Sequence, residues 1–156
     1  MNATDPSEGY GVITHSDGTI QRLGALLNMA KLGELAVSET EAREIFAATN
    51  KLANAAMSLV AHMTYARRVD LTGTPLLPED FKADPQGHMG GSLNMVIAFT
   101  GYLAANALTG HTRAWTLGQG HCVAAIEAIN TLTGDLSPEQ LGRYDRSETG
   151  LAQLVQ

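Results

Sequence analysis

Two short segments of this 156-residue chain combine glycines with a histidine in the same way. Residues 86–92 read Gln-Gly-His-Met-Gly-Gly-Ser, and residues 117–122 read Leu-Gly-Gln-Gly-His-Cys. Each precedes an apolar stretch typical of a buried helix. Glycines let the backbone approach a ligand closely, and the free N–H groups at a helix N-terminus attract an anion. His88 and His121 would add a hydrogen-bond donor or a proton carrier that works near neutral pH.

The same turns have a simpler interpretation, in which the glycines cap helices and the histidines are ordinary polar residues. Against it, residues 86–133 contain two such turns and only two charged residues, Arg113 and Glu127. Both interpretations therefore stay open from the residues alone. In the ligand interpretation, His88 and His121 are the candidate catalytic residues. The candidate lining glycines are Gly87, Gly90, Gly91, Gly118 and Gly120.

Metal binding and thiol chemistry are disfavoured. The five histidines show neither HxxxH nor HxH spacing and have no carboxylate cluster nearby, so no metal ligands are predicted. Cys122 follows His121 directly, but adjacent residues on a helix point about 100° apart. We therefore predict that Cys122 is a buried, unreactive thiol.

The turns must be positioned by the elements around them. Apolar spacing predicts a helix over 20–35, and Ser38 with Glu41 has the spacing of a capping box that opens a long helix over 39–65. Residues 70–87 are a connector rich in Gly and Pro. The remaining predicted elements are helices over 92–108, 121–132 and 138–144 and a strand over 113–117.

A helix, a strand, a glycine turn and a second helix in this order predict an α/β fold with few short parallel strands. We divide the chain into an N-terminal arm and short helix (1–37, the arm being 1–19), the long helix and its connector (38–81), and a partial ligand-binding α/β domain (82–156). Residues 151, 154 and 155 begin a further apolar pattern that stops at the end of the sequence.

Composition excludes several classes of function. Lys and Arg number 10 against 16 Asp and Glu, so the net charge of −6 disfavours nucleic acid as a partner. Aromatic residues are only 5%, which disfavours a base-stacking surface. A single cysteine suits a reducing compartment, and no apolar run reaches the roughly 20 residues that span a bilayer. We expect a cytoplasmic protein without a membrane partner. The apolar segment 86–133 needs cover, which predicts a homo-oligomer.

Three motifs resemble one enzyme family. Residues 82–95, which contain Gly87-His88-Met89-Gly90-Gly91 and Leu93-Asn94-Met95, are similar to the start of transketolases, where a Gly-His-Pro-Gly turn opens a helix of the cofactor domain. Residues 113–121 resemble that family's strand ending in Asn-Gly-His. Residues 132–141, Leu-Thr-Gly-Asp-Leu-Ser-Pro-Glu-Gln-Leu, resemble its continuation. Order and spacing agree across residues 82–145.

The resemblance implies a thiamine-diphosphate enzyme that uses Mg²⁺ and transfers a two-carbon unit from a ketose phosphate. His88 and His121 would contact the hydroxyls of a sugar-phosphate substrate, and the five glycines would line the cofactor. Phosphoketolases, a related branch, cleave xylulose 5-phosphate or fructose 6-phosphate with phosphate. Their Gly-Pro-Gly-His-Gly turn is similar to residues 118–121, so the branch stays open.

Two departures limit what the chain is expected to do alone. Met89 stands where the transketolase turn has proline, and no Gly-Asp-Gly, the family's anchor for Mg²⁺ and diphosphate, occurs in the sequence. We therefore expect an N-terminal fragment whose partner is the missing C-terminal part, inactive and without a firmly held cofactor by itself. A rival of another class is a non-catalytic oligomerisation or interaction module, which the alanine-rich face of helix 39–65 favours.

Overall fold

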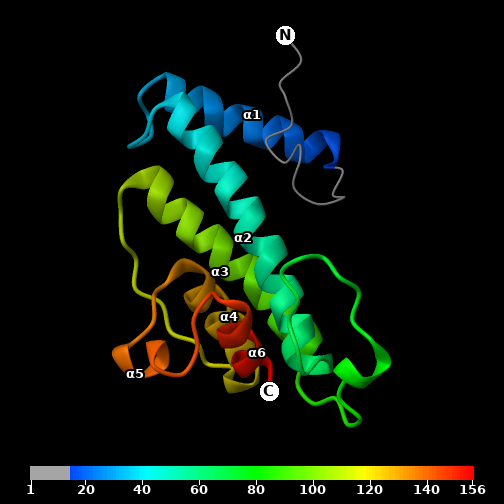
Figure 1. Ribbon diagram of the computed structural model, residues 1–156. Helices are drawn as coiled ribbons and strands as arrows, with labels where there is room; N and C mark the ends of the chain where they lie inside the picture. Colours follow the sequence, from blue (N-terminus) through cyan, green and yellow to red (C-terminus); the bar gives the residue numbers. More distant parts are fainter. Residues whose placement is uncertain (1–14) are drawn as a thin grey trace. The chain divides into compact units, whose positions relative to one another are not determined.

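The computed structural model describes residues 15–156, of which 65% are helical. Most of the predicted N-terminal arm, residues 1–14, lies outside this range. Figure 1 labels the α-helices in chain order. They are α1 (Asp17–Lys31), α2 (Glu39–Tyr65), α3 (Met89–Thr109), α4 (Val123–Thr133), α5 (Pro138–Leu141) and α6 (Glu148–Val155), with 3-10 turns η1 (Pro78–Asp80) and η2 (Gly120–Cys122).

The predicted α/β fold is wrong, because residues 15–156 form an all-α structure with no strand. Residues 113–117, which we predicted as a strand, form no regular element. A strand needs a neighbour for its backbone N–H and C=O groups. Instead, side chains tie this segment to α3: Tyr102 donates from Oη to the carbonyl of Ala114 (3.0 Å), and Arg113 donates from Nη1 to Asn106 Oδ1 (3.0 Å).

The predicted helices exist, with shifted ends. The long helix over 39–65 is confirmed as α2, whereas α1 lies a few residues before the predicted 20–35. Helix α3 begins at Met89 instead of residue 92, and η2 with α4 covers the predicted 121–132. Helix α5 is shorter than predicted, and the apolar pattern after residue 150 belongs to α6.

Helix starts follow the capping signals in the sequence. The backbone N–H of Ser38 donates to Glu41 Oε2 (2.8 Å), and the N–H of Glu41 donates to Ser38 Oγ (3.3 Å). The same reciprocal pair joins Ser137 and Gln140 at α5 (3.0 and 3.2 Å). These bonds satisfy N–H groups that a helix start otherwise leaves unpaired.

The chain divides into two compact units, and unit 1 contains the described part of residues 1–54 together with 100–116. Its core is a cluster of buried residues from α1, the start of α2 and the end of α3, namely Leu27, Ala30, Ala42 and Leu108. The N–H of Ala36 donates to the carbonyl of Leu108 (3.0 Å), so the connection between α1 and α2 is held to α3.

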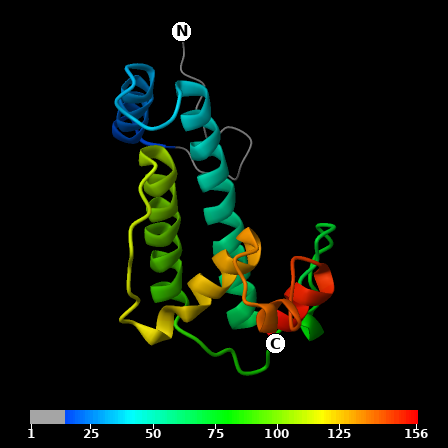
Figure 2. The same ribbon diagram turned by 90° about the vertical axis from the view of Figure 1, so that its left-hand side faces the viewer.

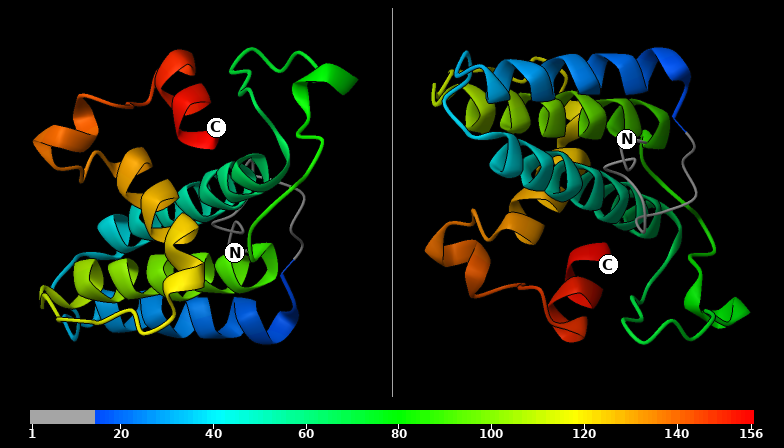
Figure 3. Two further views of the ribbon diagram at one scale, coloured as in Figure 1. Left: turned by 90° about the horizontal axis from the view of Figure 1, so that it is seen from below. Right: turned by 90° about the horizontal axis from the view of Figure 1, so that it is seen from above.

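Unit 2 contains residues 55–99 and 117–156. Its fully buried side chains include Val60 of α2, Val96 of α3, Ile129 of α4 and Val155 of α6. In Figure 3 the yellow-to-red part of the chain shows α4, α5 and α6 joined by short connections. Both Gly-His turns belong to this unit, so one core positions them.

None of the helices within residues 15–156 has the length and apolar character that crossing a lipid bilayer requires.

Candidate functional site

His88 lies at the start of α3. Its carbonyl accepts the first hydrogen bond of that helix from the N–H of Ser92 (3.0 Å), and its side chain is exposed. The preceding residue, Gly87, has φ of +125°, a backbone conformation that side chains with a Cβ rarely adopt. The glycine therefore allows the chain to turn into α3 with the imidazole of His88 outside the core.

His121 lies at the start of the next helix. It is the middle residue of η2, which runs directly into α4, and the N–H of Cys122 closes this turn on the carbonyl of Gln119 (3.0 Å). The side chain of His121 is exposed, whereas Cys122 is 1% exposed. The thiol is thus buried as predicted.

The structure brings the two histidines together. Their ring centroids are 4.8 Å apart and their planes meet at 61°, an edge-to-face contact. Figure 2 shows the corresponding arrangement of the backbone, with the yellow start of α4 beside the green start of α3. The two turns therefore lie next to each other, with both imidazoles on the surface.

Gly91 makes this arrangement compact. A Cβ at Gly91 would lie 3.1 Å from Cys122 Sγ and 3.6 Å from atoms Cδ2 and Nε2 of His121. The η2 turn therefore packs directly on the first turn of α3. By contrast, no atom lies within 4 Å of a Cβ built at the other three predicted glycines, Gly90, Gly118 and Gly120. Backbone conformation explains Gly87 and packing explains Gly91, and neither requires glycine at the remaining three.

Electrostatics at the histidine pair favour an anion. The first turns of α3 and α4 carry no acidic residue, so no carboxylate of those turns neutralises the partial positive charge of their N-termini. The two rings can donate hydrogen bonds from their N–H groups. Within residues 15–156, no group of three or more His, Cys, Asp and Glu side chains could hold a metal ion.

Glu127, the acidic residue of the apolar segment, has a different environment. Its carboxylate accepts hydrogen bonds from Tyr144 Oη (2.7 Å) and Gln140 Nε2 (3.2 Å), which fasten α5 and the following residues to α4. Burial raises the pKa of Tyr144 above its ordinary value, and the hydrogen bond to Glu127 raises it further. We therefore infer that these hydrogen bonds have a structural role and do not form part of the candidate site.

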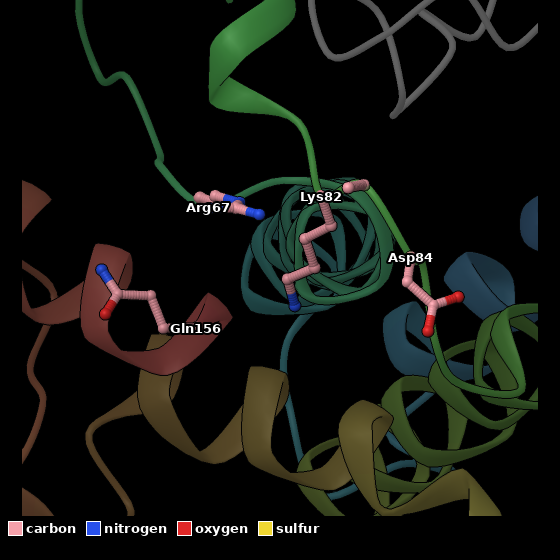
Figure 4. Close-up of a pocket in the computed structure, with 5 residues that line it drawn as sticks. Arg67, Lys82, Asp84 and Gln156 are labelled. Atoms are coloured by element: carbon pink, nitrogen blue, oxygen red, sulfur yellow. The ribbon is translucent and has the colours of Figure 1, made fainter.

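Sequence reasoning did not find a second group of polar residues in unit 2. Arg67, Lys82, Ala83, Asp84 and Gln156 line a cavity of about 570 Å³ (Figure 4). Arg67 lies just beyond α2, which ends at Tyr65. No spacing rule relates residues 67 and 82, which the fold brings together.

We compared the chain with protein-family models, with curated proteins and with solved structures. None of the three comparisons finds a match.

Proposed function

We propose that this chain contributes the N-terminal part of the active site of a transketolase-like, thiamine-diphosphate-dependent enzyme in the cytoplasm. The observation that carries the proposal is the ring contact of His88 and His121 at 4.8 Å, at the starts of two helices. The motif order over residues 82–145 supports the same assignment. A ketose phosphate has both features that such a pair can bind, namely hydroxyl groups and a negative charge.

The roles of the two histidines follow from their surroundings. Each ring can donate a hydrogen bond to a substrate oxygen that gains negative charge, or carry a proton between two oxygens. Because the rings touch, one substrate can contact both, and the first turns of α3 and α4 favour its anionic end. Fixing the rings in advance avoids the entropy cost of ordering them in the transition state.

The chain's own residues do not fit an anchor for the cofactor. Thiamine diphosphate would supply the carbanion chemistry when bound, but Mg²⁺ requires oxygen ligands such as carboxylates, and the first turns of α3 and α4 carry no acidic residue. The sequence also lacks Gly-Asp-Gly. The proposal therefore assigns cofactor and metal binding to a further part of the enzyme, and only substrate contacts to this chain.

The test uses the enzyme that contains this chain together with its cofactor anchor. We expect the His88→Ala and His121→Ala variants each to lower kcat/KM for two-carbon transfer by roughly 10²–10⁴, the range for a lost acid–base group. Residues 1–156 alone should show no turnover. The His111→Ala variant is the matched control, because His111 is exposed and belongs to unit 1.

The outcome distinguishes the branches as well. Dependence on phosphate as the acceptor identifies the phosphoketolase branch, and dependence on an aldose phosphate identifies the transketolase branch. Full activity of both histidine variants contradicts the assignment. Turnover by residues 1–156 alone contradicts the assignment of cofactor binding to a further part of the enzyme.

A second candidate is a non-catalytic interaction module. Exposed apolar side chains in unit 2 favour it, among them Val123 in the first turn of α4 (51% exposed) and Phe81 (47% exposed). A stop codon directly after Gln156 in the reading frame supports this candidate. A downstream Gly-Asp-Gly motif followed by asparagine supports the enzyme.

A further inference from the structure

A backbone pairing in unit 2 places two cationic side chains together. The N–H of Arg67 donates to the carbonyl of Asp80 (2.8 Å), and the N–H of Lys82 donates to the carbonyl of Tyr65 (2.8 Å). These bonds flank the antiparallel bridge between Ala66 and Phe81. Successive side chains on paired extended segments point to opposite faces. Arg67 and Lys82, each one residue beyond the bridge, therefore lie on the same face.

That face opens into the cavity of about 570 Å³. In the view of Figure 4, Lys82 lies between Gln156 on one side and Asp84 on the other, and Arg67 lies toward the side of Gln156. The side chains that line the cavity include two cations, Arg67 and Lys82, and one carboxylate, Asp84.

Most of the N–H groups of Arg67 and Lys82 are available to a ligand. Lys82 Nζ donates one hydrogen bond, to the carbonyl of Met63 (2.7 Å), which holds the ammonium in place and leaves two N–H groups. Arg68 and Arg43 form ion pairs with carboxylates. Among the described residues, the guanidinium of Arg67 forms no ion pair with a carboxylate, and the side chain of Arg67 is exposed.

The carboxylate of Asp84 does not neutralise the pair directly. Its Oδ2 accepts a hydrogen bond from Gln86 Nε2 (3.2 Å), and in Figure 4 it does not point toward Arg67 or Lys82. Both cations line the same cavity, and an anion bound there would interact favourably with each of them.

We propose that this cavity binds a phosphoryl oxyanion, either inorganic phosphate or the phosphate group of a small metabolite. The guanidinium of Arg67 presents parallel N–H groups that match two oxygens of a phosphoryl group, and the ammonium of Lys82 adds a point charge. The proposal is independent of the proposed enzymatic function, because none of the lining residues belongs to the Gly-His turns.

The test is a titration of the full chain with sodium phosphate at constant ionic strength, followed residue by residue by NMR. We expect saturable shifts at residues 67 and 82–84. The Arg67→Gln variant should bind phosphate about tenfold more weakly, the usual effect of a lost charge-assisted hydrogen bond. The Asp84→Asn variant should bind severalfold more tightly, because it removes a negative charge from the lining.

The Arg146→Gln variant is the matched control, since Arg146 is exposed, carries the same charge and does not line the cavity. It should bind phosphate as the unaltered chain does. An equal loss in this variant shows a general charge effect and overturns the site, as does a wild-type titration without saturable shifts at residues 67 and 82. The Asp84→Asn variant keeps the test decisive if Arg67→Gln fails to fold, because unchanged or weaker phosphate binding by Asp84→Asn overturns the site.

Ribose 5-phosphate and ribose distinguish the two sources of the anion. Shifts at residues 67 and 82 with the phosphate ester, but not with ribose, support a metabolite phosphate. Shifts with inorganic phosphate alone support free phosphate. Shifts with ribose that equal those with its phosphate ester overturn an oxyanion site. Activity loss in the histidine variants tests the proposed function separately, because His88 and His121 do not line this cavity.

Discussion

The contact between His88 and His121 depends on neighbouring residues that have no reactive side chain. Gly87 supplies the backbone conformation before α3, and Gly91 supplies the space into which Cys122 and the ring of His121 pack. At the residue scale, the identity of the neighbours therefore decides whether the imidazoles can act together.

We predict that Gly91→Ala is less stable than Gly90→Ala. Alanine in a helix gains up to about 1 kcal/mol over glycine, and Gly90 has no atom within 4 Å of an added Cβ. At Gly91 the same Cβ meets Cys122 Sγ at 3.1 Å, so the buried sulfur must shift by a few tenths of an ångström. Urea unfolding of both variants should show a difference of about 1 kcal/mol or more. Equal unfolding free energies contradict the close packing of η2 on α3.

At the scale of elements, short-range polar signals decide where helices begin. The reciprocal bonds of Ser38 and Glu41 start α2, the longest helix in residues 15–156. The hydrogen bonds from the Ser38 side chain and then from its backbone lower the pKa of Glu41 below its ordinary 4.5. A carboxyl whose pKa is lowered by folding stabilises the folded state above its ordinary pKa, and that contribution disappears as the pH falls through the folded-state pKa.

We predict a pH-dependent cost for Ser38→Ala. Near neutral pH, Glu41 is ionised and accepts both bonds, so the variant should unfold at lower denaturant concentration than the unaltered chain. As the pH falls and Glu41 becomes protonated in both proteins, the difference should shrink. NMR titration should also show a higher pKa for Glu41 in the variant. An unchanged pKa contradicts the role of Ser38. Ser58→Ala, at an exposed position within α2, is the control.

At the scale of the whole molecule, burial is incomplete for the charge-poor segment. Residues 86–133 were expected to be covered, yet Val123 is half exposed at the start of α4. A small apolar cavity of about 400 Å³, lined by residues that include Tyr65, Ala66 and Phe81, also opens at the surface of unit 2. Exposed apolar surface of this kind favours association with another surface.

We predict that the chain forms a homodimer or a larger homo-oligomer. Light scattering at tens of micromolar should report a mass above that of one chain. Val123→Asp should reduce the mass, because it charges the exposed apolar position, while an acidic residue in the first turn of α4 preserves the helix. Leu71→Asp, in the exposed connector, is the control and should leave the mass unchanged. A monomeric mass for the unaltered chain contradicts the prediction.

Most of the helices and the existence of two Gly-His turns before helices could be anticipated from sequence. Apolar spacing and capping residues act over a few positions, so α2, α3 and α4 were predicted close to their observed bounds. The repeated glycines and histidines, each before a helix, indicated the two turns. The sequence alone does not assign a chemical role to His88 and His121, and that role stays a proposal.

Only the tertiary structure decided the remaining features. Residues 113–117 have the composition of a strand, but a strand exists only where a neighbour pairs with it, and Arg113 and Tyr102 instead hold this segment to α3. From sequence, Gly91 is an ordinary glycine at a helix start, and only the structure shows that η2 packs against it. Arg67 and Lys82 become neighbours only through the bridge of Ala66 with Phe81. Each depends on contacts between residues far apart in the chain, which local spacing cannot encode.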